Sequence, residues 1–278
     1  MAKSILFDAT KCTGCRGCQT ACKQWNELPA DWKPGELNRG TYENPKDLSE
    51  KTWLKMRFNE VGDAAVGDIA WLFSRYACMH CGDAACINVC PTGALYRAPE
   101  GMVLYDKDIC SGCGYCVEAC PFSVPRMEEG WSKLTGKGKV ARKCTMCIDR
   151  VTATTDAVPE KDRIPACVKT CPTGALQFGD RNEMVNLGRL RVQELAIPGR
   201  NVRLYGETEC GGTNVMFILD HNAKDYGLPE DPKVSGVTTA WQKYLQPIGY
   251  AVVGLVAAGL AVNYMAARAR MLHGKEGK

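Results

Sequence analysis

The spacing of the cysteines constrains this chain more than any other feature. Of its 17 cysteines in 278 residues, all but Cys210 fall into four groups of four. Within each group only two to four residues separate neighbouring cysteines, apart from one gap of nineteen in the last group. The groups are Cys12, Cys15, Cys18 and Cys22; Cys78, Cys81, Cys86 and Cys90; Cys110, Cys113, Cys116 and Cys120; and Cys144, Cys147, Cys167 and Cys171. Thiols gathered this densely in fours predict bound metal.

Three uses of cysteine compete to explain this pattern. A disulfide scaffold is typical of short secreted chains, whereas this chain is long, has an odd cysteine count and begins without a signal-peptide pattern in residues 1–8. Structural zinc sites often include histidine, of which the chain has only three. Iron–sulfur clusters take four thiolates each at dense local spacing. The pattern therefore favours four [4Fe–4S] clusters, and a structural zinc scaffold is the alternative from another class.

The same spacing predicts which cysteines share a cluster. In two-cluster ferredoxins the first three cysteines of a C-x2-C-x2-C-x3-C run bind one cluster, and the fourth binds the other cluster. We therefore pair the first group with the fourth, and the second with the third. The predicted ligands are Cys12, Cys15, Cys18 and Cys171 for cluster A; Cys22, Cys144, Cys147 and Cys167 for cluster B; Cys78, Cys81, Cys86 and Cys120 for cluster C; and Cys90, Cys110, Cys113 and Cys116 for cluster D.

An internal repeat supports a duplicated unit. The hexapeptide Cys90–Leu95 recurs without change at Cys171–Leu176. We expect an α+β fold of two nested bacterial-ferredoxin-like units followed by one C-terminal transmembrane helix. The outer unit, with clusters A and B, comprises residues 1–72 and 122–180; the inserted unit, with clusters C and D, comprises 73–121; a C-terminal extension that contacts partners comprises 181–240.

Short apolar and β-branched runs predict strands at residues 5–7, 55–58, 69–73, 102–105 and 215–219. Residues 94–97 and 102–105 flank Pro99-Glu100-Gly101, which predicts a hairpin turn. Asp180, as N-cap, and Glu183 open a predicted helix carrying Met184, Leu187 and Leu190. Residues 24–52 are rich in Pro, Gly, Asn and charge, and predict a surface excursion that is either a simple loop or a partner-docking surface.

The composition changes sharply near the C-terminus. Residues 248–267 contain no charged side chain, and twenty helical residues span about 30 Å, the hydrocarbon thickness of a bilayer. We predict a transmembrane helix over 244–267 and a basic tail over 268–278, with a buried helix of a soluble core as the alternative. Basic residues follow the span at 268, 270, 275 and 278, against 233 and 243 before it. This bias predicts a cytoplasmic tail and a cluster domain on the periplasmic or outer face. The cluster domain would then cross the membrane while bound to a partner that carries the export signal.

Net charge and the remaining side chains exclude other functions. The formal charge of +4 is too small for a nucleic-acid binder driven by phosphate contacts, and four clusters at about −2 each would make it about −4. No nucleophile, general base or substrate pocket is evident. His80 either tunes cluster C or makes a local contact, His221 is expected at the surface, and His273 at the membrane interface. Cys210 is expected to be a free structural thiol.

Several further segments are distinctive: residues 22–26, 40–45, 114–116, 120–122 and 143–147, and above all Gly211–Met216 together with the single C-terminal span. Together they resemble one family, the iron–sulfur (beta) subunit of membrane-bound formate dehydrogenase. The resemblance implies a non-catalytic electron-transfer subunit. Its partners would be a catalytic subunit with a molybdenum or tungsten pterin and a membrane cytochrome b that reduces quinone. It also implies that electrons enter at cluster A, pass B and C, and leave from D. The second interpretation is the four-cluster subunit of a membrane hydrogenase or of a sulfur-compound or nitrogen-oxide reductase.

Overall fold

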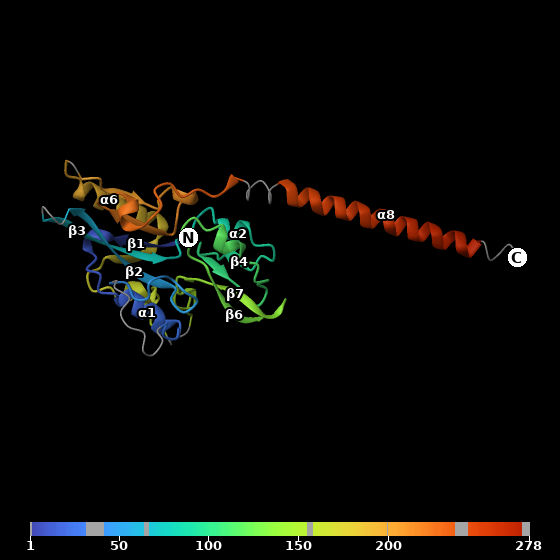
Figure 1. The fold of residues 1–278 in the computed structure, drawn as a ribbon, viewed down its shortest axis with the longest axis horizontal. Coiled ribbons are helices and arrows are strands. Elements are labelled where there is room, and N and C mark those ends of the chain that lie inside the picture. The colour runs from blue at the N-terminus through green and yellow to red at the C-terminus, as the bar shows by residue number, and fades with distance from the viewer. Residues whose placement is uncertain are drawn as a thin grey trace. The chain divides into compact units, whose positions relative to one another are not determined.

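A computed structural model describes residues 2–31, 42–63, 67–154, 158–198, 200–236 and 244–273. The chain divides into two compact units, Met1–Val234 and Ser235–Lys278. The first unit contains all the cysteines, and the second contains the long helix α8, Gln246–His273 (Figure 1). The mixed helix and strand content agrees with the predicted class, and the nesting of two ferredoxin-like units stays a prediction.

A four-stranded sheet joins the two ends of the first unit. Its order is β8 (Leu176–Asp180), β1 (Lys3–Asp8), β10 (Val215–Leu219) and β9 (Arg203–Tyr205). The N-terminal strand β1 runs parallel to β10, with Ile5 opposite Val215, and antiparallel to β8. Strands β1 and β10 thus hold the C-terminal extension against the start of the chain. The runs predicted at 5–7 and 215–219 lie within these two strands.

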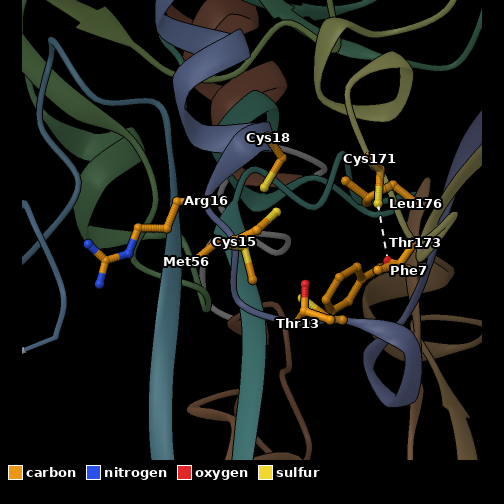
Figure 2. A pocket seen from close by; sticks show the side chains of 10 residues that line it. Phe7, Thr13, Cys15, Arg16, Cys18, Met56, Cys171, Thr173 and Leu176 are labelled. Carbon is orange, nitrogen blue, oxygen red and sulfur yellow. Dashed lines mark hydrogen bonds between the residues drawn. The ribbon is translucent and has the colours of Figure 1, made fainter.

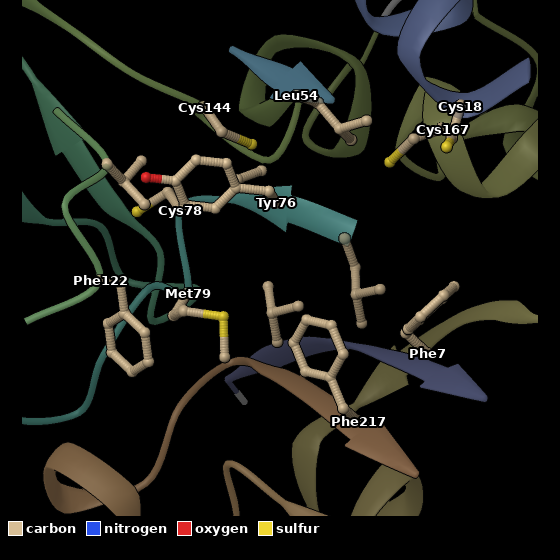
Figure 3. Packing of buried hydrophobic residues seen from close by; sticks show 14 of the residues in the cluster. Phe7, Cys18, Leu54, Tyr76, Cys78, Met79, Phe122, Cys144, Cys167 and Phe217 are labelled. Carbon is tan, nitrogen blue, oxygen red and sulfur yellow. The ribbon is translucent and has the colours of Figure 1, made fainter. Parts of the chain in front are cut away.

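Alternation along the strands separates two layers of core. Leu6 and Met216 pack with Met184 on one face of the sheet, where helix α6 (Arg181–Leu195) lies. Phe7 and Phe217 belong to the other face, where their rings meet edge to face at 5.4 Å between centroids. Because successive side chains of a strand point to opposite faces, one short strand serves both cores. The second core also contains buried cysteines, Cys18, Cys144 and Cys167 among them (Figure 3).

Three antiparallel hairpins complete the strands. They are β2 (Leu54–Asp63) with β3 (Asp68–Ala77), β4 (Leu95–Arg97) with β5 (Val103–Tyr105), and β6 (Arg126–Ser132) with β7 (Gly136–Arg142). The predicted strands at 55–58 and 69–73 lie within β2 and β3. The predicted turn between β4 and β5 is also confirmed, because Ala98 N donates to Met102 O at 2.9 Å and Gly101 has a positive φ.

Most of the helices described in the first unit are short, and several of them carry cysteines. They are η1 (Ala9–Lys11), α1 (Gly17–Trp25), α2 (Ala85–Asn88), α3 (Tyr115–Glu118), α4 (Ile148–Val151), η3 (Glu160–Asp162), α5 (Ala166–Lys169), η4 (Glu209–Gly211) and η5 (Ala223–Tyr226). Helices α1, α2, α3 and α5 each carry at least one cysteine of the four groups. Short helices of this kind hold sulfur atoms at fixed positions along a loop.

The predicted helix after Asp180 is confirmed as α6, with Asp180 in the N-cap position. The expected capping hydrogen bond is absent, however, because the side chain of Asp180 makes no bond to the helix backbone. Its carboxylate accepts from Lys3 Nζ at 2.9 Å instead. The ion pair with the neighbouring strand β1 therefore replaces the local cap.

Helix α8 is long and apolar enough over Gln246–Arg268 to cross a membrane. This agrees with the predicted span at 244–267. The tail lysines at 275 and 278, and Lys243 before the span, lie outside the described residues. Within the described part of residues 24–52, the chain forms no strand or helix after Trp25, as expected for an excursion, although Leu48 is buried.

Candidate iron–sulfur centres

All 17 cysteines are free thiols and lie in the first unit. Among the cysteines of the four groups, only Cys15 and Cys113 are exposed; the others are buried or half-buried. In the described part of the chain, no three His, Cys, Asp or Glu side chains are arranged to hold a single metal ion. The neighbours of each sulfur therefore decide which cysteines the fold brings together.

The cysteines predicted for cluster A line one small pocket, with Phe7, Met56 and Leu176 as apolar walls. Figure 2 shows Cys15, Cys18 and Cys171 around it, with Arg16 pointing away. Burial raises the pKa of Cys12 to about 11, and the nearby charges of Cys171 and Cys15 raise it further against a hydrogen bond from Gly14 N. Cys171, from the far end of the cysteine-rich part, thus lies beside the first group.

The cysteines predicted for cluster B also come together from distant segments. Burial raises the pKa of Cys22 well above its usual range, and the three sulfurs that reinforce this shift are those of Cys144, Cys167 and Cys147. Burial likewise raises the pKa of Cys147 to about 12. Helix α1 packs against α5, so the last cysteine of the first group faces the fourth group.

Around the predicted cluster C, a hydrogen bond with Cys210 and then burial raise the pKa of Cys81, and nearby Cys78 and Cys120 add to the shift. Burial raises the pKa of Cys86 to about 12, with Cys78 and Cys120 again among its neighbours. Cys120, the last cysteine of the third group, therefore lies among the first three of the second.

Around the predicted cluster D, a cysteine of the second group lies beside cysteines of the third group. Burial raises the pKa of Cys116 to about 12, and the neighbouring sulfurs that raise it further are those of Cys110, Cys113 and Cys90. The fold thus places the last cysteine of each group near the three cysteines of its predicted partner group. The four ligand sets themselves stay a prediction.

Glycine shapes the loop of the third cysteine group. Gly112 has φ +74°, and a Cβ atom there would lie 2.5 Å from the backbone oxygen of Lys139 in strand β7. Only glycine fits both the left-handed backbone and this close approach. Gly114 in the same loop has φ +79°, but a Cβ atom there would meet nothing within 4 Å. The loop therefore packs tightly against the β6–β7 hairpin on one side only.

His80 makes a local hydrogen bond with one ring nitrogen, and its other ring nitrogen has no hydrogen-bond partner. Its Nδ1 accepts from Val103 N at 3.1 Å, so the ring proton is assigned to Nε2. Nε2 is buried and has no hydrogen-bond partner. Burial, and then the charges of Lys143 and Arg75, hold the pKa of His80 well below its usual range. His80 is thus a neutral donor among the cysteine ligands.

Two buried cations among the sulfurs were missed by the sequence reasoning. Arg75 is 1 % exposed and Lys143 is 2 % exposed. Lys143 Nζ donates to the backbone oxygens of Val103 and Cys144, whereas two nitrogens of Arg75, Nε and Nη1, have no hydrogen-bond partner. An arginine near the end of strand β3, followed by Tyr76 and Ala77, was the signal that could have revealed the first of these sites.

The residues present fit an anionic cluster. A charge is costly to bury unless an opposite charge or a set of hydrogen bonds compensates it. The structure surrounds buried Arg75 and Lys143 with cysteine sulfurs, and a cluster with four thiolates carries about −2 when oxidised. Clusters held by these thiolates would supply the missing counter-charge.

The remaining side chains singled out in the sequence are Cys210, His221 and His273. Cys210 is buried beside the proposed cluster C: its Sγ donates to Pro232 O at 3.2 Å, and it shares a hydrogen bond with Cys81. His221 is partly exposed and pairs with Asp220 at 3.0 Å, as expected for a surface histidine. The side chain of His273 is not described.

Comparison with known protein families identifies the kind of domain that this chain contains. Residues 69–181 match the model of a 4Fe-4S dicluster domain, and residues 9–25 match a 4Fe-4S binding domain. The chain therefore carries 4Fe–4S domains, in agreement with the predicted cofactor. The dicluster match covers the second, third and fourth cysteine groups, and the shorter match covers the first.

The relatives narrow the class. The nitrate-inducible formate dehydrogenase iron–sulfur subunit of Escherichia coli is 38 % identical over 94 % of this chain and 83 % of its own length. The formate dehydrogenase-O iron–sulfur subunit of the same species is 40 % identical over 91 % of this chain and 78 % of its own. Formate dehydrogenase 2 subunit beta (cytochrome c-553) of Nitratidesulfovibrio vulgaris is 35 % identical over 81 % and 97 %. The chain belongs to the family of formate dehydrogenase iron–sulfur subunits.

Proposed function

We propose that this chain is the non-catalytic electron-transfer subunit of a membrane-bound formate dehydrogenase complex. It would receive electrons from a catalytic subunit with a molybdenum or tungsten pterin and deliver them to a membrane cytochrome b that serves quinone. The observation that carries this proposal is that cysteines of different groups lie close together, as Cys22 does to Cys144 and Cys167, in a chain that belongs to this family.

Each proposed cluster takes three ligands from one group and one from its partner group, in the sets A to D given above. When bound, each cluster carries a single electron at a time. The exchanged ligands, Cys22, Cys90, Cys120 and Cys171, would tie the segments of two nested ferredoxin-like units together. The raised pKa values of Cys12 and Cys116 support such sites, because buried sulfurs that must become thiolates need iron to offset their charge.

The exposed ligands support the proposed order of electron transfer. Cys15 belongs to the proposed cluster A and Cys113 to cluster D, the first and last stations of the relay. Exposed aromatic side chains come from the same regions: Trp71, in contact with Phe73 beside the first loop, and Tyr115 beside Cys113. A relay needs its end stations near the surface, where partner subunits dock.

Helix α8 is proposed to anchor the complex, with the cluster domain on the periplasmic or outer face and the C-terminus in the cytoplasm. Its apolar length over Gln246–Arg268 supports the membrane span. The positive charges at Arg268 and Arg270 support the orientation. Protease treatment of spheroplasts tests it. External protease should cut the cysteine-rich part, and its complete protection would contradict the orientation.

The experiment that tests the function uses the anaerobically purified complex. Formate should reduce the clusters, seen as bleaching of broad visible absorption and as new electron paramagnetic resonance signals. Reduction by hydrogen but not by formate would contradict the proposal and favour a hydrogenase subunit. Metal analysis that found a few zinc ions in place of iron would favour a structural scaffold.

A further inference from the structure

Arg75 lies where two of the proposed clusters would meet. It is the third residue from the end of strand β3, and its side chain is almost fully buried at 1 % exposure. Its Nη2 donates to Cys144 Sγ at 3.8 Å, whereas Nε and Nη1 are buried and have no hydrogen-bond partner. No carboxylate forms an ion pair with it in the part of the chain that the structure describes.

The sulfurs around Arg75 come from two ligand sets. Burial opposes its charge, but nearby cysteines outweigh this effect and raise its pKa; they are Cys167, Cys144, Cys18 and Cys22. Cys18 belongs to the proposed cluster A, and the other three belong to cluster B. Cys18 and Cys167 are themselves neighbours, and Figure 3 shows their side chains side by side. The guanidinium therefore contacts a ligand of cluster B, and its charge also acts on Cys18 of cluster A.

A fixed cation in this place has a definite electrostatic effect. Arginine is not deprotonated in proteins, so the charge of Arg75 is permanent. Each electron that a cluster accepts adds one negative charge, and a buried cation stabilises that reduced form more than the oxidised one. Hydrogen bonds to the sulfurs act in the same direction, and they are one of the factors that set cluster potentials. The unpartnered Nε and Nη1 of Arg75 are available for such bonds.

We propose that Arg75 is a positioning residue for the first transfer within the relay: its guanidinium is the counter-charge shared by clusters A and B and raises the reduction potential of both. This inference rests on the proposed function, since it needs both clusters. It goes further in naming a residue that sets the potentials of the two clusters at the entry of the relay.

Lys143 provides a comparison inside the same core. It is equally buried, but its charge acts on Cys86 and Cys120 of the proposed cluster C, and its Nζ is already bonded to two backbone oxygens. Removing its charge should affect cluster C, whereas cluster A should keep its potential. The two cations thus separate a local effect from a general loss of buried charge.

The test is a redox titration of the anaerobically purified complex, followed by electron paramagnetic resonance, with iron content measured on each sample. The variants are Arg75→Gln, which removes the charge, Arg75→Lys, which keeps it, and Lys143→Gln as the comparison. Arg189→Gln is the surface control, because Arg189 is exposed and its ion pair is with Glu207. Cluster D is the internal reference, since the neighbouring charges that raise the pKa of its ligand Cys116 are those of Cys110, Cys113 and Cys90.

Arg75→Gln should lower the equilibrium constant for one-electron reduction of clusters A and B at least tenfold, which corresponds to about 59 mV per electron. Arg75→Lys and Arg189→Gln should stay within about threefold of the wild type. If Arg75→Gln fails to assemble clusters while Arg75→Lys assembles them, the need for the charge is equally supported.

Unchanged potentials in an assembled Arg75→Gln variant would overturn the inference. So would equal loss of clusters in both Arg75 variants, because charge would then not be what the site requires, or an equal shift of cluster A in Lys143→Gln. A wild-type complex without formate-reducible clusters would instead contradict the proposed function, and the two failures are therefore distinguishable.

Discussion

At the scale of single residues, the cysteine loops depend on glycines as much as on sulfur. Gly112 and Gly114 stand two residues apart with nearly equal positive φ angles. A Cβ atom at Gly112 would meet strand β7, whereas one at Gly114 would meet nothing within 4 Å. Alanine in the left-handed region costs roughly 1–2 kcal/mol at either position. At Gly112 the new Cβ must also displace the backbone oxygen of Lys139. A backbone atom is harder to move than the end of a flexible side chain.

We therefore expect Gly112→Ala to weaken the third cysteine loop more than Gly114→Ala, by at least about 1 kcal/mol beyond the shared backbone cost. The measurement is the temperature at which visible cluster absorption is lost during anaerobic heating. Gly112→Ala should lose absorption at a lower temperature than Gly114→Ala. Equal temperatures for the two variants would show that the contact with strand β7 is unimportant.

At the scale of elements, helix α8 differs from the other helices in its long apolar composition. Its apolar residues over Gln246–Arg268 are exposed in the second unit. An arginine at the centre of a membrane span costs about 2.5–3.5 kcal/mol, and far less near an end, where the side chain reaches the interface. The position of a new charge along α8 therefore reports whether the helix spans a bilayer.

Ala257→Arg, near the centre of the helix, should release the chain from membranes washed with alkaline carbonate. Ala267→Arg, beside Arg268, should leave it in the membrane fraction. The readout is the distribution of the chain between pellet and supernatant. Full retention of Ala257→Arg would indicate that partner subunits, and not α8, hold the chain at the membrane.

The elements also show which parts of the structure the sequence predicts. Strands β2, β3 and β10 follow from local runs of apolar residues, and the cysteine grouping follows from spacing, because both signals lie within a few residues. The parallel pairing of β1 with β10 joins Ile5 to Val215 and has no local signal. The roles of Arg75 and Lys143 were missed for the same reason, since burial of a charge depends on segments far apart in the chain.

At the scale of the whole molecule, electron flow depends on every station in series. Loss of one ligand should interrupt transfer at that cluster while the stations before it still fill. Cys116 is a proposed ligand of cluster D, the last station, and Cys210 is the one cysteine outside the four sets. The pair offers matched cysteine-to-alanine variants.

Cys116→Ala should abolish quinone reduction while formate still reduces the upstream clusters, and its iron content should fall by up to one cluster. Cys210→Ala removes a hydrogen bond to Cys81 but no proposed ligand, so this variant should keep its iron content and its quinone reduction. Steady-state quinone reduction and formate-induced spectral changes measure the two effects. Undiminished quinone reduction in Cys116→Ala would contradict the assigned path.

The central claim is that sixteen thiols hold four cubane clusters. Its most direct test is the count of iron and acid-labile sulfide per chain in the anaerobically purified protein. Four [4Fe–4S] clusters require about sixteen of each. A protein with a few zinc ions and no labile sulfide would contradict the account.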